Sequence, residues 1–270
     1  MGLVGAAGHD LYVNTFGDSN KFLQQLYVLS DYYTSGLIRV NINGVDVAFG
    51  DYDEQKGYPV VTGDYAGLIW IKYYDGRQTT SDSYLINNSN PAGRWTGDHK
   101  GIGTSYIIVS LTYDQEKLTG EPQFFFEYYG APLYDWRKDS TRGGVGPHRV
   151  NDVATHEFTE NPIVMEYNYR VGLSVNGDLF CGMNMPLSDL PLDKWTVAAN
   201  LADELVGSEP RYRCSTFVDC MDTHGNNIET MTNACGAMTV EGVAGVWPLV
   251  GSSQPIVATF TDDDLIDGLS

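Results

Sequence analysis

The stretch GTSYIIVSLTYDQEKLTGEPQFFFEYYGAPLYD, Gly103 to Asp135, largely decides the expected fold. It contains two strongly β-prone runs, Tyr106–Tyr113 and Gln123–Tyr129. Alternation in the first run predicts a strand with one apolar and one partly apolar face. The second run is aromatic on both faces, which suits a strand covered on each side. The loop of about nine residues between them can join antiparallel neighbours, so the two runs are predicted to form a pair of core strands.

Further strand signals precede this stretch. Leu26–Ser30 and Leu37–Ile42 carry alternating apolar residues. Asn43-Gly44 is a strong hairpin-turn signal that leads into Val45–Phe49. Leu68–Tyr74 is predicted to be another apolar strand.

Three helices are predicted after residue 160. The first has Asn161 as its N-cap, followed by a proline, and Gly172 as its C-cap. The second is predicted over Lys194–Val206 with Asp193 as its cap, and the third starts from Asn227. The buried positions of the second and third helices are expected to be Val197, Ala198, Leu201, Ala202 and Leu205, and Ile228, Met231, Cys235 and Met238.

The C-terminal residues are predicted to add strands. Glu209 opens one that runs to about Met221, and Gly245–Val250 is expected to pair with Ile256–Phe260 in a hairpin. Asp262-Asp263-Asp264 indicates a further helix start, because carboxylates favour a helix N-terminus.

These elements predict a β-rich α+β fold, with antiparallel sheets or barrels and about three short helices in the C-terminal half. Residues 136–160 lack periodicity and are interpreted as a long connection. It would separate an all-β domain, residues 1–135, from an α+β domain, residues 136–270.

The charge balance restricts the partners of this chain. Its 35 acidic and 16 basic residues give a formal net charge of −19. Such a surface repels nucleic-acid phosphates and anionic lipid, so we expect no nucleic-acid binding. No apolar run is long enough for a transmembrane helix, and the first residues lack the features of a secretory signal.

No residue pattern predicts a metal or cofactor site. Asp51 and Asp53 resemble the start of a calcium loop, but the required glycine and glutamate are missing further on. His148 and His156 are separated by irregular chain, and the HExxH pattern lacks its second histidine. A triad at Asp262–Asp264 is the remaining metal alternative, although adjacent aspartate side chains diverge.

Catalytic motifs are also missing. The chain has no phosphate-binding loop and no dinucleotide fingerprint, and Gly172–Asn176 lacks the last glycine of GxSxG. We therefore expect a protein that is not an enzyme, with no catalytic, cofactor-binding or metal-binding residues. The cysteines form no CxxC pair and are expected to be buried free thiols: Cys181, Cys214, Cys220 and Cys235.

Several motifs follow one another along the chain in a characteristic order. They are GxxYxxVxLxYD at Gly103–Asp114, FxFExxG at Phe124–Gly130, xPLYDxR at Ala131–Arg137, NP with a later Tyr and Gly at Asn161–Gly172, EPRYxC at Glu209–Cys214 and VAxFTxxDxIxG at Val257–Gly268. An earlier YVLS…ING motif lies in Tyr27–Val45, although Asp31-Tyr32-Tyr33-Thr34 replaces the usual acidic-Gly-Pro-Ile. The set resembles the tail-tip host-specificity (J-like) proteins, or central tail hub proteins, of long-tailed bacteriophages and prophages.

This resemblance implies that the chain is a segment of a structural virion protein of the phage tail tip. Such hub proteins form homotrimers, contact other tail-tip and tail-tube proteins, and act in tail assembly, host attachment or the triggering of DNA ejection. A host receptor or glycan would then be bound through other parts of the chain. The implied location is the virion, and the host cytoplasm during assembly.

Two other classes remain open. A carbohydrate-binding adhesin module would account for the tyrosines and tryptophans, since aromatic rings stack on sugars. A segment of a cell-wall hydrolase is the enzyme alternative, because catalytic groups assemble from distant positions without a motif.

Overall fold

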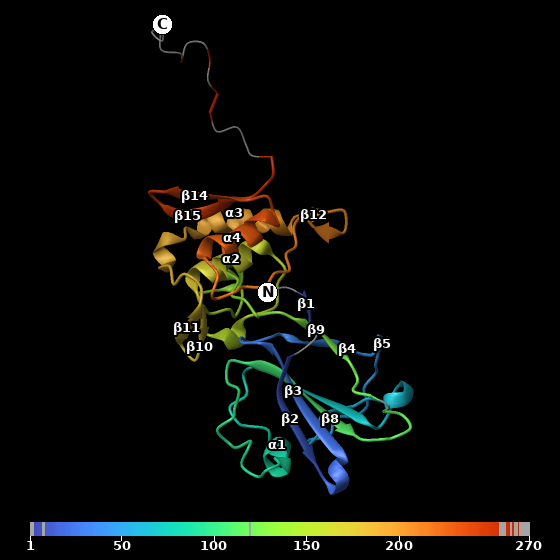
Figure 1. The fold of residues 1–270 in the computed structure, drawn as a ribbon. Coiled ribbons are helices and arrows are strands. Elements are labelled where there is room, and N and C mark those ends of the chain that lie inside the picture. The colour runs from blue at the N-terminus through green and yellow to red at the C-terminus, as the bar shows by residue number, and fades with distance from the viewer. Residues whose placement is uncertain are drawn as a thin grey trace.

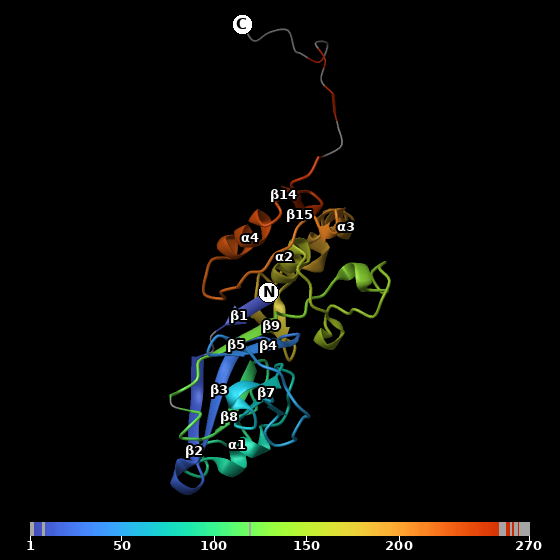
Figure 2. The same ribbon diagram turned by 90° about the vertical axis from the view of Figure 1, so that its right-hand side faces the viewer.

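The computed structural model describes residues 3–6, 9–118, 120–253, 258–259, 261 and 264. Figures 1 and 2 show two parts joined end to end: the sheet part, which is the described residues between 3 and 130, and the helical part, residues 131–250. The fold is α+β and rich in antiparallel sheet, as predicted. The described strands close no barrel, because every sheet has two end strands.

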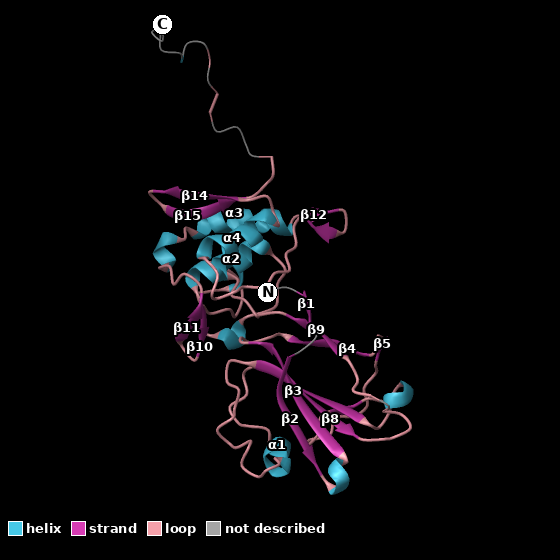
Figure 3. Cartoon of the chain, viewed as in Figure 1, coloured by secondary structure: helices cyan, strands magenta, loops and turns pink. Residues whose placement is uncertain are grey.

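Two antiparallel sheets form the sheet part (Figure 3). One has five strands in the order β2-β3-β8-β7-β6, and the other has four in the order β1-β9-β4-β5. The strands are β1 Leu3–Ala6, β2 His9–Phe16, β3 Phe22–Ser30, β4 Gly36–Ile42, β5 Val45–Asp46, β6 Tyr58–Pro59, β7 Ile69–Tyr74, β8 Ser105–Thr112 and β9 Phe124–Tyr129.

The predicted hairpin at Asn43-Gly44 is confirmed. Ile42 of β4 pairs with Val45 of β5 across the turn. Asn43 and Gly44 both have positive φ, 50° and 85°, which is the conformation that a tight two-residue hairpin turn requires.

The predicted pairing of the two runs in Gly103–Asp135 is wrong. β8 pairs with β3 and β7, whereas β9 pairs with β1 and β4, so the two strands belong to different sheets. The connection between them is long enough to carry the chain from one sheet to the other. Their apolar faces still meet in one core, where Ile107 and Val109 join Phe124 and Phe126.

β9 is covered on one side only, which corrects the expectation of a strand covered on both. Phe126 is fully buried, while its neighbour Phe125 is 43% exposed. By contrast, β8 is buried on both faces, as its partly apolar second face suggested. That second face packs against Leu85 and Trp95, which belong to a part of the chain with no predicted element.

Leu85 lies in α1, Ser83–Asn88, a short helix that the sequence analysis did not predict. Its N-cap is Asp82, whose carboxylate accepts a hydrogen bond from the Leu85 backbone N–H at 2.7 Å. A helix of six residues is too short to show helical periodicity in the sequence.

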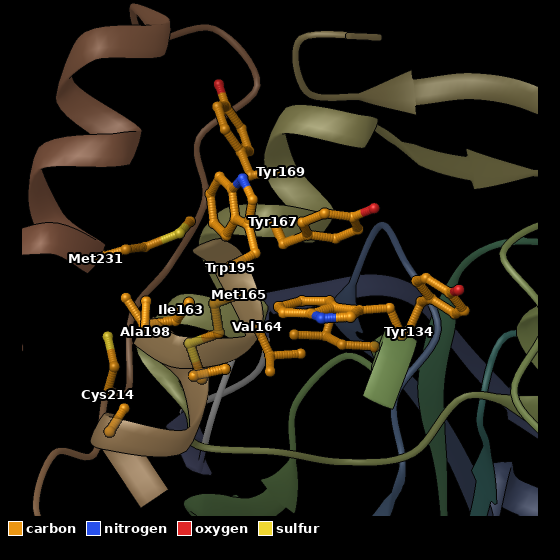
Figure 4. Close-up of a cluster of buried hydrophobic side chains, with 14 of the residues drawn as sticks. Tyr134, Ile163, Val164, Met165, Tyr167, Tyr169, Trp195, Ala198, Cys214 and Met231 are labelled. Carbon is orange, nitrogen blue, oxygen red and sulfur yellow. The ribbon is translucent and has the colours of Figure 1, made fainter. Parts of the chain in front are cut away.

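The three helices predicted after residue 160 are present: α2 Pro162–Val171, α3 Leu192–Asp203 and α4 His224–Asn233. α2 has the predicted caps, because the Asn161 side chain accepts from two backbone N–H groups and Gly172 ends the helix. Every residue of α2 except Val171 is buried. Figure 4 shows the core around this helix, where Tyr167 packs against Trp195.

The second and third helices differ from the prediction in their ends. α3 begins at Leu192, so Asp193 lies in its first turn, and the chain leaves the helix before Leu205. Ala198 and Ala202 are buried as predicted, together with Trp195 and Ala199. Val197 and Leu205, which were also predicted to be buried, are 60% and 66% exposed. α4 is capped by Thr223, which places Asn227 inside the helix, and Met238 lies beyond it and is exposed.

The strands of the helical part are short hairpins. They are β10 Leu173–Val175 with β11 Asp178–Cys181, β12 Leu205–Val206 with β13 Glu209–Pro210, and β14 Met238–Gly242 with β15 Gly245–Leu249. The predicted strand from Glu209 to Met221 is therefore wrong beyond Pro210. β15 pairs with β14. Most of Ile256–Phe260, the predicted partner of Gly245–Val250, lies outside the described residues, as does most of the motif at Val257–Gly268.

We predict that Phe126→Ala lowers the free energy of unfolding by about 3–5 kcal/mol, because it leaves a cavity between the two sheets. Phe125→Ala is the matched control on the same strand and should cost less than about 1 kcal/mol. Urea unfolding followed by circular dichroism measures both. Equal losses for the two variants would contradict the assignment of the Phe126 face to the core.

Candidate functional site

The chain passes from the sheet part to the helical part after β9, and the segment that makes this connection is held by side chains. The Tyr134 backbone N–H donates to the Asn168 side-chain oxygen at 2.9 Å. The Asn168 amide donates in return to the Tyr134 carbonyl and to the Val164 carbonyl, both at 2.8 Å. Because Asn168 belongs to α2, it fixes the end of the PLYD motif against the central helix.

Asp139 organises the next residues of the connection. Its carboxylate is 1% exposed and accepts hydrogen bonds from the Tyr134 hydroxyl, the Thr141 backbone and hydroxyl, and Arg149. Burial alone raises the pKa of Asp139, but these donors outweigh it and hold the pKa below its ordinary value. The segment interpreted as a connection is therefore ordered and hydrogen-bonded around the buried Asp139.

Two adjacent tyrosines of the sheet part reach into the helical part. Tyr32 is 5% exposed, its ring stacks on Phe180 of β11 at 5.8 Å, and its hydroxyl donates to the Ser174 carbonyl at 3.3 Å. Tyr33 is also buried, and the Arg77 guanidinium lies over its ring, 5.4 Å from the ring centre. Both tyrosines pack in the core of the helical part, so they join the two parts by apolar contact.

Glycines allow this close packing at two places. Gly76 has φ +97°, and a Cβ there would lie 3.0 Å from the Tyr33 ring. Gly103, the first residue of the stretch that decides the fold, has φ +80°, and a Cβ there would lie 2.6 Å from Val175 of β10. A larger residue at Gly76 would displace Tyr33, and one at Gly103 would push β10 away from the sheet part.

Tyr32 forms a wall between two cavities at this junction. The first, of about 620 Å³, is lined by polar and apolar residues alike and includes Arg77, Asp152 and His156. The second, of about 510 Å³, is more apolar and includes Phe180 and Phe217. Tyr32 and Leu173 line both cavities. We treat this junction, Tyr32 and Tyr33 with the two cavities beside them, as the candidate functional site.

The two histidines considered as metal ligands lie near each other, with ring centres 6.1 Å apart. Each of them forms a hydrogen bond with the protein backbone. His148 Nδ1 accepts from the Asp135 N–H at 3.0 Å, and His156 Nε2 donates to the Arg149 carbonyl at 3.0 Å. Burial lowers the pKa of both, that of His156 to about 4. No group of three or more metal-binding side chains occurs among the described residues.

The other candidate residues are dispersed. Asp53 is exposed and accepts from the backbone N–H groups of Gln55 and Lys56, so it shapes a local turn. Ser174 lies in β10 and bonds Tyr32 through its carbonyl. Asp262 and Asp263 lie outside the described residues. Three of the cysteines are buried free thiols as expected, but Cys220 is exposed.

Two basic residues of the connection, Arg137 and Lys138, pair with carboxylates. Arg137 contacts Asp135 at 2.7 Å and Asp203 at 2.9 Å, and Lys138 contacts Glu157 at 2.5 Å. The sequence analysis gave no role to Tyr32 and Tyr33. The available signal was their position: two large aromatic residues interrupt the YVLS…ING motif where the family pattern has glycine and proline.

Comparisons with known proteins find similarity among solved structures. No protein-family model matches the chain, and no curated protein matches it. A chain from a structure described as the virion of a native gene transfer agent particle is similar with a TM-score of 0.35 and 17% sequence identity. The match covers 53% of this chain and 29% of that one. Separately, no helix within the described residues has the length and apolar character needed to span a membrane.

We predict that Tyr32→Ala lowers the free energy of unfolding by about 3–5 kcal/mol, since it removes the aromatic wall between the two cavities. Tyr32→Phe keeps the ring, loses only the bond to the Ser174 carbonyl and should cost about 1 kcal/mol. Chemical denaturation of both variants measures the difference. A loss in Tyr32→Phe as large as that in Tyr32→Ala would contradict a role based on ring packing.

We predict that His156 makes the stability of the folded protein sensitive to acid. Its folded pKa of about 4 lies below the ordinary histidine value, so its contribution is fully present above pH 6.5 and is lost as the pH falls towards 4. As the pH falls from 6.5 to 5, the free energy of unfolding should decrease by about 1–2 kcal/mol less in His156→Gln than in the unmodified protein, after allowance for the partial exposure of His156. In His99→Gln, at an exposed position, the free energy of unfolding should decrease by as much as in the unmodified protein. Thermal unfolding across this pH range provides the measurement, and identical pH profiles for His156→Gln and the unmodified protein would refute the assignment.

Proposed function

We propose that this chain is part of a structural protein of a phage or prophage tail tip, a central hub that acts in tail assembly and host attachment. On this proposal the chain is a homotrimer in the intact tail, contacts other tail-tip and tail-tube proteins, and carries out no catalysis. Its location is the virion, after assembly in the host cytoplasm.

The observation that carries the proposal is the position of the hub-like motifs in the fold. GxxYxxVxLxYD forms β8 and FxFExxG forms β9, the two strands whose apolar faces meet in the core of the sheet part. The PLYD motif is the segment anchored by Asn168, and the motif from Asn161 to Gly172 spans α2 with both of its caps. The motifs thus fall on the residues that hold the molecule together, as expected where a shared sequence pattern reflects a shared scaffold.

The ordered connection fits a role in assembly. A hub must keep its parts in a fixed orientation while neighbouring proteins bind to it. The buried tyrosines, the Asn168 bonds and the Asp139 network all act between elements that are far apart in the sequence, which favours a rigid junction.

The carbohydrate-binding alternative gains no specific support from the aromatic residues. Trp95 is sandwiched between Tyr12 and His99, with ring centres 4.9 and 4.8 Å away. Trp136 and Trp195 are buried in the core of the helical part. These three of the five tryptophans therefore pack against other side chains of the protein, whereas Tyr52 and Tyr113 are 50% and 59% exposed.

Immunogold electron microscopy of particles from the organism that carries this gene tests the proposal. Antibodies raised against the purified chain should label the tip of the tail. Particles stripped of tails provide the control and should remain unlabelled. Label on the capsid, or no label on intact particles in which the chain is detected by mass spectrometry in stoichiometric amounts, would refute a tail-tip location.

Light scattering over a concentration series examines the trimer separately. A molar mass that rises towards three times 29.8 kDa places a trimer interface within these residues. A mass that stays at one chain assigns trimerisation to other parts of the hub and leaves the location to be decided by the microscopy.

A further inference from the structure

Two cysteines far apart in the sequence meet at the junction. Cys181 is the last residue of β11 and is buried, whereas Cys220 is exposed in the irregular chain that precedes α4. Both cysteines line the cavity of about 510 Å³ beside Tyr32. Cys220 lies close enough to Cys181 to help raise the pKa of the buried thiol. Disulfide formation requires this kind of proximity between two side chains.

The position of Cys220 is fixed by the residue beside it. The Asn227 side chain accepts from the Asp219 N–H at 3.2 Å and donates to the Asp219 carbonyl at 2.8 Å. The same amide group of Asn227 also donates to the Tyr169 hydroxyl at 3.1 Å. Since Asn227 lies in α4 and Tyr169 in α2, the loop that carries Cys220 is attached to the helical core and held opposite β11.

We propose that Cys181 and Cys220 form an intrachain disulfide when the protein enters an oxidising environment. The exposed Cys220 reacts first: its thiolate attacks a sulfur of a small-molecule disulfide such as oxidised glutathione and releases one glutathione thiol. Cys181 then gives up its proton and attacks the Cys220 sulfur of the mixed disulfide, which releases the second glutathione. The two protein thiols are oxidised, and one glutathione disulfide is reduced to two thiols.

The different surroundings of the two thiols set this order. Burial, followed by the neighbouring Cys220, raises the pKa of Cys181 to about 12, so it is a poor first nucleophile. Cys220 is accessible to a reagent in solvent. Once formed, the bond would join β11 to the loop before α4 and close about 40 residues of chain, including α3, which restricts the unfolded state and stabilises the helical part.

The experiment compares the purified native protein in oxidised glutathione and in dithiothreitol. In the oxidised sample we expect two of the four thiols to be lost, with one cross-linked peptide pair containing Cys181 and Cys220 after digestion under non-reducing conditions. The melting temperature should rise by roughly 5–10 °C relative to the reduced sample. Cys220→Ser should abolish this oxidation-dependent shift.

Cys214→Ala is the matched control, because it removes a buried thiol outside the pair; its oxidised-minus-reduced shift should equal that of the unmodified protein. The comparison is made within each variant, so a general loss of stability does not affect it. Four thiols that stay free in oxidised glutathione would overturn the proposal. So would a cross-link between two chains through Cys220, or a shift that persists in Cys220→Ser.

Discussion

Buried irregular backbone must have its hydrogen-bonding groups satisfied, and in this protein side chains meet that requirement between β9 and α2. Asn168 bonds both backbone groups of Tyr134, His148 accepts from the Asp135 N–H, and Asp139 gathers four donors. With these partners, and with short 3-10 helices at Trp136–Lys138 and Val153–Thr155, the segment packs against α2. The relative position of the two parts, the placement of Tyr32 and Tyr33 and the shape of both cavities all depend on it.

The fold class and most elements could be predicted from the sequence, because local signals determine them. The Asn43-Gly44 turn, the caps of α2 and the alternation in β8 each act within a few residues. Strand pairing could not be predicted in the same way. β8 and β9 follow one another in the sequence but belong to different sheets, and which partner a strand finds is decided by distant residues. The exposed Val197 shows the same limit for helices, since the face that is buried depends on what lies beside it.

The candidate site was less accessible to sequence reasoning. Its residues come from separate elements and form no motif: Tyr32 follows β3, Phe180 lies in β11, and Asn168 lies in α2. The sequence marked Tyr32 and Tyr33 only as a departure from the hub pattern. Cys181 and Cys220 likewise lack the spacing that would suggest a pair, and only the folded chain places both on the wall of one cavity.

The central position of β9 has a consequence for synthesis on the ribosome. β9 lies between β1 and β4, so the four-stranded sheet cannot assemble until residues near Tyr129 have left the exit tunnel. Until then β4 presents unpaired backbone groups to solvent, and β3 is in the same position until β8 is made. Nascent chains on neighbouring ribosomes could pair through these edges. The rate of translation up to β9 therefore influences how much of the protein reaches its native sheet order.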